Sequence, residues 1–271
     1  MKISIIGLGW LGEPLAHHLI SQGHEVTGST TSEEKHQQLT KEGIPNQILK
    51  FVPHPEGKQF NRLFKTDALI INIPPKRRHF PDTFHPEQIK YVKSLAIQSR
   101  VKKVIYTSAT SVYPNLNRLM RESEKLDHNN TGNPALLDAE NLLWKDRDYD
   151  LTVIRLGGLL GMDRIPGKYF SGKENVPGHP PVNYIHQSDA IRLITFILEK
   201  DIWNQTFNGV SPIHPSKKEV FLKNAQELGI APPRSFDLGK KADWKEIDGT
   251  KIGEFGFRFI YENPLFFDYL L

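Results

Sequence analysis

The stretch MKISIIGLGWLG, residues 1–12, decides the fold, because it joins two patterns of different period at a group of glycines. Residues 3–6 form a short, mostly β-branched apolar run, which is typical of a buried strand. Leu11, Leu15 and Leu19 then recur at helical spacing. The sequence therefore predicts a strand, a tight turn and a helix in direct succession.

Three glycines in that turn, spaced GxGxxG, indicate a site for the pyrophosphate of a dinucleotide rather than a simple loop. Gly7 would allow the sharp turn, Gly9 would let the pyrophosphate reach the backbone, and Gly12 would let the helix pack closely on the strand. The start of the helix would then present unpaired N–H groups to the phosphates. The predicted cofactor contacts of this stretch are Gly7, Gly9, Trp10, Leu11 and Gly12.

The bulk composition predicts a compact globular protein. The 271 residues are 38% hydrophobic and 24% charged, enough for one large α/β unit or two unequal parts. The net charge of +4 comes from scattered Lys and Arg, which favours a small anionic ligand over nucleic acid. The chain has no cysteine, so disulfides and thiolate chemistry are excluded. We expect a cytoplasmic protein without a signal peptide or a membrane span, because glycines break the apolar start and no later run is long enough.

The choice between NAD and NADP depends on residues 27–32, where an NAD site usually carries an acidic residue for the ribose. This stretch, TGSTTS, contains no carboxylate, and Lys35 follows one helical turn further on. Ser29, Thr30 and Thr31 are predicted to contact the cofactor as hydrogen-bond donors, and NADP is predicted over NAD. Hydroxyl-rich turns also form for local capping alone, which is the alternative.

Further buried strands are expected at residues 47–51, 68–73, 103–108 and 151–156, with helices between several of them at 84–99 and 135–146. This alternation predicts an α/β fold with a doubly wound parallel sheet. Ligands of such sheets bind at the carboxyl ends of the strands. The further predicted cofactor contacts there are Ile73, Pro74, Thr107 and Leu156. The domains expected are a dinucleotide-binding domain at 1–160, to which a helix at about 186–200 returns, and a smaller substrate lobe at 161–271.

The glycine turn and three later segments, VIYTSATSVY at 104–113, VIRLGGLLG at 153–161 and VNYIHQSD at 182–189, resemble the extended short-chain dehydrogenase/reductase superfamily. More narrowly, the chain is similar to an atypical member of the nucleoside-diphosphate-sugar epimerase-like group. The resemblance runs nearly end to end. It implies a Rossmann domain that binds NAD(P), a small C-terminal substrate lobe, and redox or epimerase chemistry on a sugar nucleotide.

The catalytic positions of that family depart from its pattern. Its enzymes use a Ser or Thr, a Tyr and a Lys, and the matching positions here hold Ala109, Ala135 and Ala139. Loss of positioned proton transfer typically costs about 10²- to 10⁴-fold in rate. Either another group moves the proton, or no proton moves.

Candidate substitutes are Tyr113, Tyr184, His186 and, next to Ala109, Ser108, although Tyr113 also suits a packed aromatic at a strand end. Asp189 is expected to cap the helix that follows it. The basic loop at residues 164–173 has two equal interpretations. It is either a binding site for an anionic substrate or a solvated surface loop without a binding role. The predicted substrate contacts are Asn183, His186, Arg164 and Lys168.

Two classes of function remain open at this point. One is an NAD(P)-dependent oxidoreductase or epimerase-like enzyme with an unusual acid/base, and the other is a non-catalytic NAD(P)-binding sensor. The opening also resembles that of the β-hydroxyacid dehydrogenases, but those enzymes need an all-helical C-terminal domain, which the proline-rich second half does not predict. The histidines lack HExxH or other ligand spacing, so no metal is predicted.

Overall fold

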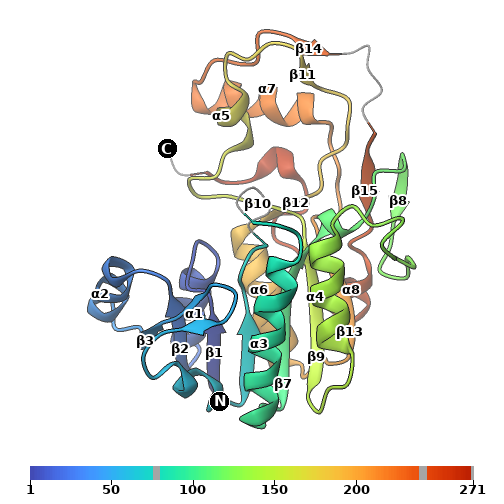
Figure 1. Ribbon diagram of the computed structural model, residues 1–271. Coiled ribbons are helices and arrows are strands. Elements are labelled where there is room, and N and C mark those ends of the chain that lie inside the picture. The colour runs from blue at the N-terminus through green and yellow to red at the C-terminus, as the bar shows by residue number, and fades with distance from the viewer. Residues whose placement is uncertain (76–79, 238–242, 270–271) are drawn as a thin grey trace. The chain divides into compact units, whose positions relative to one another are not determined.

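The computed structural model describes residues 1–75, 80–237 and 243–269 (Figure 1). The chain forms two compact units, and each is described by itself. The first unit comprises Met1–Val112, Asp127–Ile154 and Ile194–Thr206, and the second comprises Tyr113–Leu126, Arg155–Leu193 and Phe207–Leu271. The units are discontinuous in sequence, and a single domain boundary near residue 160 stays a prediction.

The main sheet has seven strands in the order β13-β9-β7-β6-β1-β2-β3. The pairs β1–β2, β1–β6, β2–β3 and β6–β7 all run parallel, which confirms the predicted doubly wound sheet. The strands are β1 (Lys2–Ile6), β2 (Glu25–Thr30), β3 (Asn46–Ile48), β6 (Ala68–Ile71), β7 (Lys103–Ala109), β9 (Asp150–Leu156) and β13 (Gln205–Gly209).

Helices alternate with these strands along the chain. The helix that follows β1 packs through Leu15, Ala16 and Leu19, all fully buried, which is the face that the helical spacing predicts. Two others lie side by side, α3 and α4 (Figure 1). The helices are α1 (Gly12–Ser21), α2 (Glu33–Lys41), α3 (Phe84–Gln98), α4 (Pro134–Trp144) and α6 (Gln187–Glu199), with short 3₁₀ turns η1 (Phe60–Phe64) and η2 (Thr110–Val112).

The strand expected at residues 47–51 is interrupted. The Leu49 N–H donates to the carbonyl oxygen of Thr30, and β3 ends at the residue before it. The segment β4 (Lys50–Phe51) then pairs antiparallel with β5 (Pro55–Glu56) as a two-stranded hairpin. The apolar run was correctly located, but its second half leaves the main sheet.

The second unit is built from short paired strands and helices. Val176, Val182, Val220 and Phe221 form a buried apolar cluster in it. Its strand pairs are β8 (Arg118–Met120) with β15 (Lys245–Ile247), β10 (Gly158–Leu160) with β12 (Tyr184–His186), and β11 (Val176–Pro177) with β14 (Phe236–Asp237). Its remaining elements are α5 (Pro166–Phe170), α7 (Lys217–Leu228), α8 (Lys251–Glu254) and η3 (Pro264–Phe266). Within the described part of the chain, no helix has the length and apolar character needed to cross a membrane.

Candidate functional site

The glycine turn after β1 leaves no room for side chains at two of its three glycines. Gly7 has φ +110°, and a Cβ there would lie 2.4 Å from the carbonyl oxygen of Asn72. A Cβ on Gly12 would lie 2.1 Å from the carbonyl oxygen of Gly7. Both positions therefore require glycine, one for the turn and one for the contact between α1 and the turn.

Gly9 is different, because a Cβ on it would meet no atom within 4 Å. Helix α1 begins three residues later, at Gly12, and its N-cap residue Leu11 provides no side-chain hydrogen bond to the helix. The first amides of a helix lack intrahelical acceptors and carry positive partial charge. The turn thus combines an open backbone approach with a helix N-terminus, which is the arrangement that a pyrophosphate requires.

Asn72 secures this turn, and the sequence analysis did not single it out. Its Nδ2 donates to the carbonyl oxygen of Gly7 at 3.0 Å, while its Oδ1 accepts from the Thr107 hydroxyl at 3.0 Å. Its backbone N–H donates to the Ile6 carbonyl oxygen. Asn72 thereby joins the ends of β1, β6 and β7. The available signal was a polar residue that closes an apolar strand.

A cavity of about 510 Å³ begins at the glycine turn and lies entirely within the first unit. One part of its wall is apolar and includes Phe80 and Phe84, whose rings stack with centroids 4.0 Å apart. Flat apolar walls of this kind can receive an adenine ring. The apolar and backbone lining also includes Ile6, Leu8, Leu49, Phe51, Val52 and, among the predicted contacts, Gly7, Gly9, Ile73 and Pro74.

The other part of the wall is polar. Ser29, Thr30, Thr31, Ser32 and Lys35 line it, and none of the cavity-lining residues that the structure describes is acidic. Some of these hydroxyls also have structural roles: Ser29 Oγ accepts from the Gly7 N–H at 3.0 Å, and Ser32 Oγ caps α2 by accepting from the Lys35 N–H. Local capping and a polar cavity wall are thus both present at this turn.

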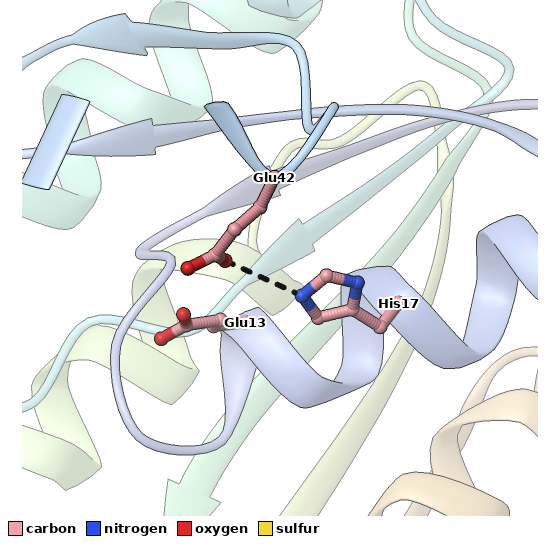
Figure 2. A group of neighbouring side chains, drawn as sticks. All are labelled: Glu13, His17 and Glu42. Carbon is pink, nitrogen blue, oxygen red and sulfur yellow. Dashed lines mark ion pairs between the residues drawn. The ribbon is translucent and has the colours of Figure 1, made fainter. Parts of the chain in front are cut away.

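Lys35 reaches from α2 to the first turn of α1. Its Nζ lies 2.6 Å from Glu13 Oε2 and 3.2 Å from Gln38 Oε1. Glu13 also belongs to a group with His17 and Glu42, whose side chains converge as Figure 2 shows. An imidazole and two carboxylates are groups that bind divalent cations. Here Glu13 is paired with Lys35, and His17 Nε2 is paired with Glu42 Oε2 at 3.5 Å.

A buried polar chain lies behind the cavity wall. Gln88 lines the cavity, donates to the Phe51 carbonyl oxygen, and has its Oε1 3.3 Å from His85 Nδ1. His85 Nε2 is 2.8 Å from the Tyr106 hydroxyl. His85 is fully buried, and burial lowers its pKa to about 4. The ring is therefore neutral near pH 7.

Ser108, one predicted catalytic residue, is buried on β7. Its hydroxyl donates to Glu140 Oε1 at 2.6 Å, and Glu140 is also buried. Ala135 and Ala139, which stand at the expected Tyr and Lys positions, are buried on α4. A role for Ser108 in proton transfer stays a prediction, and it would require the Glu140 hydrogen bond to rearrange.

Tyr113, another predicted catalytic residue, lies in the second unit and is fully buried. Its hydroxyl donates to Asn208 Oδ1 at 2.9 Å and accepts from Arg155 Nη1 at 2.7 Å. Burial raises its pKa to about 12. Both hydrogen-bond partners of the phenol are protein groups. Tyr113 would have to break these hydrogen bonds before it transferred a proton to a substrate. Catalysis by Tyr113 also stays a prediction.

Tyr184 lies on β12, is partly exposed, and packs against the apolar cluster of the second unit. Burial raises its pKa to about 12. The neighbouring Asn183 bonds to β15: its Nδ2 donates to the Lys245 carbonyl oxygen, and its Oδ1 accepts from the Ile247 N–H. Proton transfer by Tyr184 stays a prediction, and the Asn183 amide is engaged in structure.

His186 is buried between aromatic rings of the chain's last part. Its ring contacts that of Tyr261 with centroids 3.8 Å apart and planes tilted by 31°, and Nε2 lies 3.2 Å from the Asp268 carbonyl oxygen. Its Nδ1 accepts from the Ser188 N–H, so Nε2 carries the proton. Burial lowers the pKa of His186. Substrate contact by His186 stays a prediction.

The expected helix-capping role of Asp189 is wrong. Its fully buried carboxylate accepts from the N–H groups of Ile260 and Tyr261 and from Arg192 Nη1. It thus anchors the last part of the second unit to α6 instead of capping the helix. Three other predicted contacts also fall in the second unit: Leu156 is buried, Arg164 is half-buried, and Lys168 is exposed on α5.

The glycine turn, the parallel sheet and the cavity at Gly9 together define an NAD(P)-binding Rossmann protein. The family model described as the NAD binding domain of 6-phosphogluconate dehydrogenase matches residues 2–79. That match stops within the first unit, and the described part of the second unit contains three strand pairs, so the all-helical domain of a β-hydroxyacid dehydrogenase is not found there.

The chain belongs to the family of the protein YeeZ from Escherichia coli strain K12. It is 33% identical to that protein over 270 residues, which cover 97% of each chain. Its fold is that of epimerase-like short-chain dehydrogenases/reductases. The human epimerase family protein SDR39U1, solved with NADPH, has a TM-score of 0.68 at 18% identity and is matched over 97% of this chain and 96% of its own. MoeE5, solved with UDP-glucose and NAD, has a TM-score of 0.73 at 16% identity over 98% and 96%.

Proposed function

We propose that the protein is an NAD(P)-dependent oxidoreductase or epimerase-like enzyme that acts on a small, sugar-nucleotide-like substrate in the cytoplasm. The observation that carries this proposal is the open backbone at Gly9, which leads into a 510 Å³ cavity of suitable lining. When bound, NAD(P) supplies the acceptor or donor of a hydride. The protein's own residues bind and orient it through the glycine turn and the start of α1.

NADP is the proposed cofactor in preference to NAD. The support is the polar wall of the cavity, where Ser29, Thr30, Thr31 and Lys35 occur without an acidic residue among the described lining. A 2′-phosphate is attracted by an ammonium and bound by hydroxyl donors, whereas a carboxylate would repel it. Structures of the same fold hold NADPH in one case and NAD in another, so the fold admits both.

The second unit is proposed to bind the substrate, with Tyr184 as the leading proton-transfer group. Its hydroxyl has no hydrogen-bond partner among the described residues, unlike the hydroxyl of Tyr113. The sugar nucleotide is proposed because MoeE5, of similar fold, was solved with UDP-glucose. Asn183, His186, Arg164 and Lys168 remain the proposed substrate contacts.

The test has two parts. Calorimetric titration with NADPH and NADH should show binding, tighter for NADPH. A screen of nucleotide sugars, followed by oxidation or reduction of the cofactor and by product analysis, should then identify a substrate. Tyr184→Phe should lower turnover by about 10²-fold or more if its phenol moves the proton. Unchanged turnover in both Tyr184→Phe and Tyr113→Phe would remove both phenols from the mechanism.

A second candidate is a non-catalytic NAD(P)-binding sensor. It is favoured by one observation: the three positions expected to carry the catalytic set hold Ala109, Ala135 and Ala139, and the last two are buried in α4. Firm cofactor binding without turnover of any nucleotide sugar would favour this candidate over the enzyme.

A further inference from the structure

The ion pair between Glu13 and Lys35 lies at the edge of the proposed cofactor cavity. Lys35 lines the cavity, and Glu13 lies behind it in the first turn of α1. Their charged atoms are 2.6 Å apart, and both side chains are largely covered, with 27% of Lys35 and 22% of Glu13 exposed. A contact this short between partly buried groups is screened less by water than a surface pair.

The charge that Lys35 presents to the cavity is therefore offset by its own neighbours. Glu13 accepts from its ammonium, and Gln38 accepts from the same group at 3.2 Å. Glu42 belongs to the same cluster as Glu13 (Figure 2). The hydrogen bond from Gln38 lowers the pKa of Glu42 most, and the hydrogen bond with His17 and then the Lys35 charge lower it further. A phosphate monoester that contacts Lys35 would gain one cation, but it would also approach the Glu13 carboxylate.

We propose that Glu13 is a specificity-determining residue that acts through Lys35 and weakens recognition of the ribose 2′-phosphate. This inference rests on the proposed NAD(P) function. The group that Lys35 would recognise is the phosphate monoester on the adenosine ribose, which NADP carries and NAD lacks. With Glu13 present, the affinities for NADPH and NADH therefore differ less than they would if Lys35 and the hydroxyls of the polar cavity wall acted alone.

The position of Glu13 requires a test that separates two effects. Because Glu13 lies in the first turn of α1, its charge also acts on a pyrophosphate bound at that helix. Both cofactors carry the same pyrophosphate, so this effect cancels in the ratio of their affinities. The ratio of the NADPH and NADH dissociation constants therefore reports on the 2′-phosphate alone.

The variant is Glu13→Gln, which keeps an oxygen acceptor for Lys35 and removes the charge. Calorimetric titration should show that NADPH is favoured over NADH by about 10-fold more than in the wild-type protein, as removal of one nearby like charge predicts. Glu34→Gln is the matched control, because it removes an exposed acidic charge beside Lys35 in sequence and should leave the ratio unchanged. In a Lys35→Met background, Glu13→Gln should shift the ratio much less.

Three results would overturn the inference: an unchanged ratio in Glu13→Gln, an equal shift in Glu34→Gln, or the same shift with and without Lys35. Denaturation of each variant shows whether it is folded, and Glu13→Ala provides a second removal of the charge if Glu13→Gln is not. Failure of the wild-type protein to bind either NADPH or NADH is a different outcome, since it would overturn the proposed function itself.

Discussion

Asn72 holds the carbonyl oxygen of Gly7 through a 3.0 Å hydrogen bond from its side-chain amide. This bond fixes the turn at the residue whose φ is +110°. Thr107 sets the orientation of the amide by donating its hydroxyl proton to Asn72 Oδ1. The shape of the glycine turn thus depends on side chains from two neighbouring strands as well as on the glycines.

Replacement of Asn72 by Ala should therefore weaken cofactor binding. We expect the dissociation constant for NADPH to rise about 10-fold, with a loss of about 1–2 kcal/mol in the free energy of unfolding. Asn46→Ala is the matched control, because the Asn46 side chain is likewise held by hydrogen bonds, to His36, Thr40 and Ile44, and lies outside the cavity lining. It should lower stability and leave NADPH affinity unchanged. Equal losses of affinity in both variants would contradict a specific role for Asn72.

The buried His85 predicts a loss of stability in mild acid. Its pKa is about 4 in the folded protein and about 6.5 when unfolded, so the folded form binds fewer protons between these values. Its contribution is complete above pH 6.5 and declines as the pH falls towards 4. The expected loss from this residue is about 2 kcal/mol between pH 7 and pH 5.

Urea denaturation at pH 7 and pH 5 measures this effect. His85→Leu removes the titrating ring, so its stability should fall less on acidification than that of the wild-type protein. The comparison isolates His85, because the carboxylates titrate in both proteins. Equal pH dependence in the two proteins would show that His85 does not titrate as its burial indicates.

Much of the first unit followed from local patterns. Residues 3–6 and the leucines after Gly12 indicated β1 and α1, because burial of one face repeats at short sequence intervals. The break after Ile48 could not be found in this way. It arises because β3 pairs with β2 only as far as Ile48, after which Lys50 pairs with Glu56 in a separate hairpin.

The second unit was harder to predict because its partners lie far apart in the chain. Residues of β8 pair with those of β15 about 127 positions later, as Arg118 does with Lys245. Asp189 shows the same limit: its position before a helix suggested a cap, but its partners are the N–H groups at 260 and 261. Contacts between residues this far apart in the sequence produce no local periodicity, so the sequence pattern does not reveal them.

Tyr113→Phe should destabilise the protein more than Tyr184→Phe. The first change removes a hydroxyl with two buried partners, Asn208 and Arg155, and should lower the free energy of unfolding by about 1–3 kcal/mol. The second removes a hydroxyl without a described partner and should cost less than about 0.5 kcal/mol. Thermal and urea unfolding measure both. A larger loss for Tyr184→Phe would contradict the contacts assigned to these phenols.

Asp189→Asn should loosen the last part of the second unit. The change removes the charge that binds Arg192 and replaces one acceptor for the N–H groups of Ile260 and Tyr261. We expect a loss of about 2–4 kcal/mol and faster hydrogen exchange at residues 258–262. Unchanged exchange there, measured by mass spectrometry, would show that Asp189 does not anchor this segment.

The backbone at Gly9 is the proposed binding position for the pyrophosphate of NAD(P). The open space around Gly9 allows a side chain without strain in the free protein, whereas Gly12 does not allow one. Gly9→Asp should therefore retain its free energy of unfolding within about 0.5 kcal/mol. It should also lose NADPH and NADH binding by at least about 100-fold, since the carboxylate would fill and repel the phosphate position.

Calorimetric titration of folded Gly9→Asp with NADPH is the most direct measurement. We expect no detectable binding under conditions where the wild-type protein binds. Wild-type affinity in this variant would show that the pyrophosphate does not bind at Gly9.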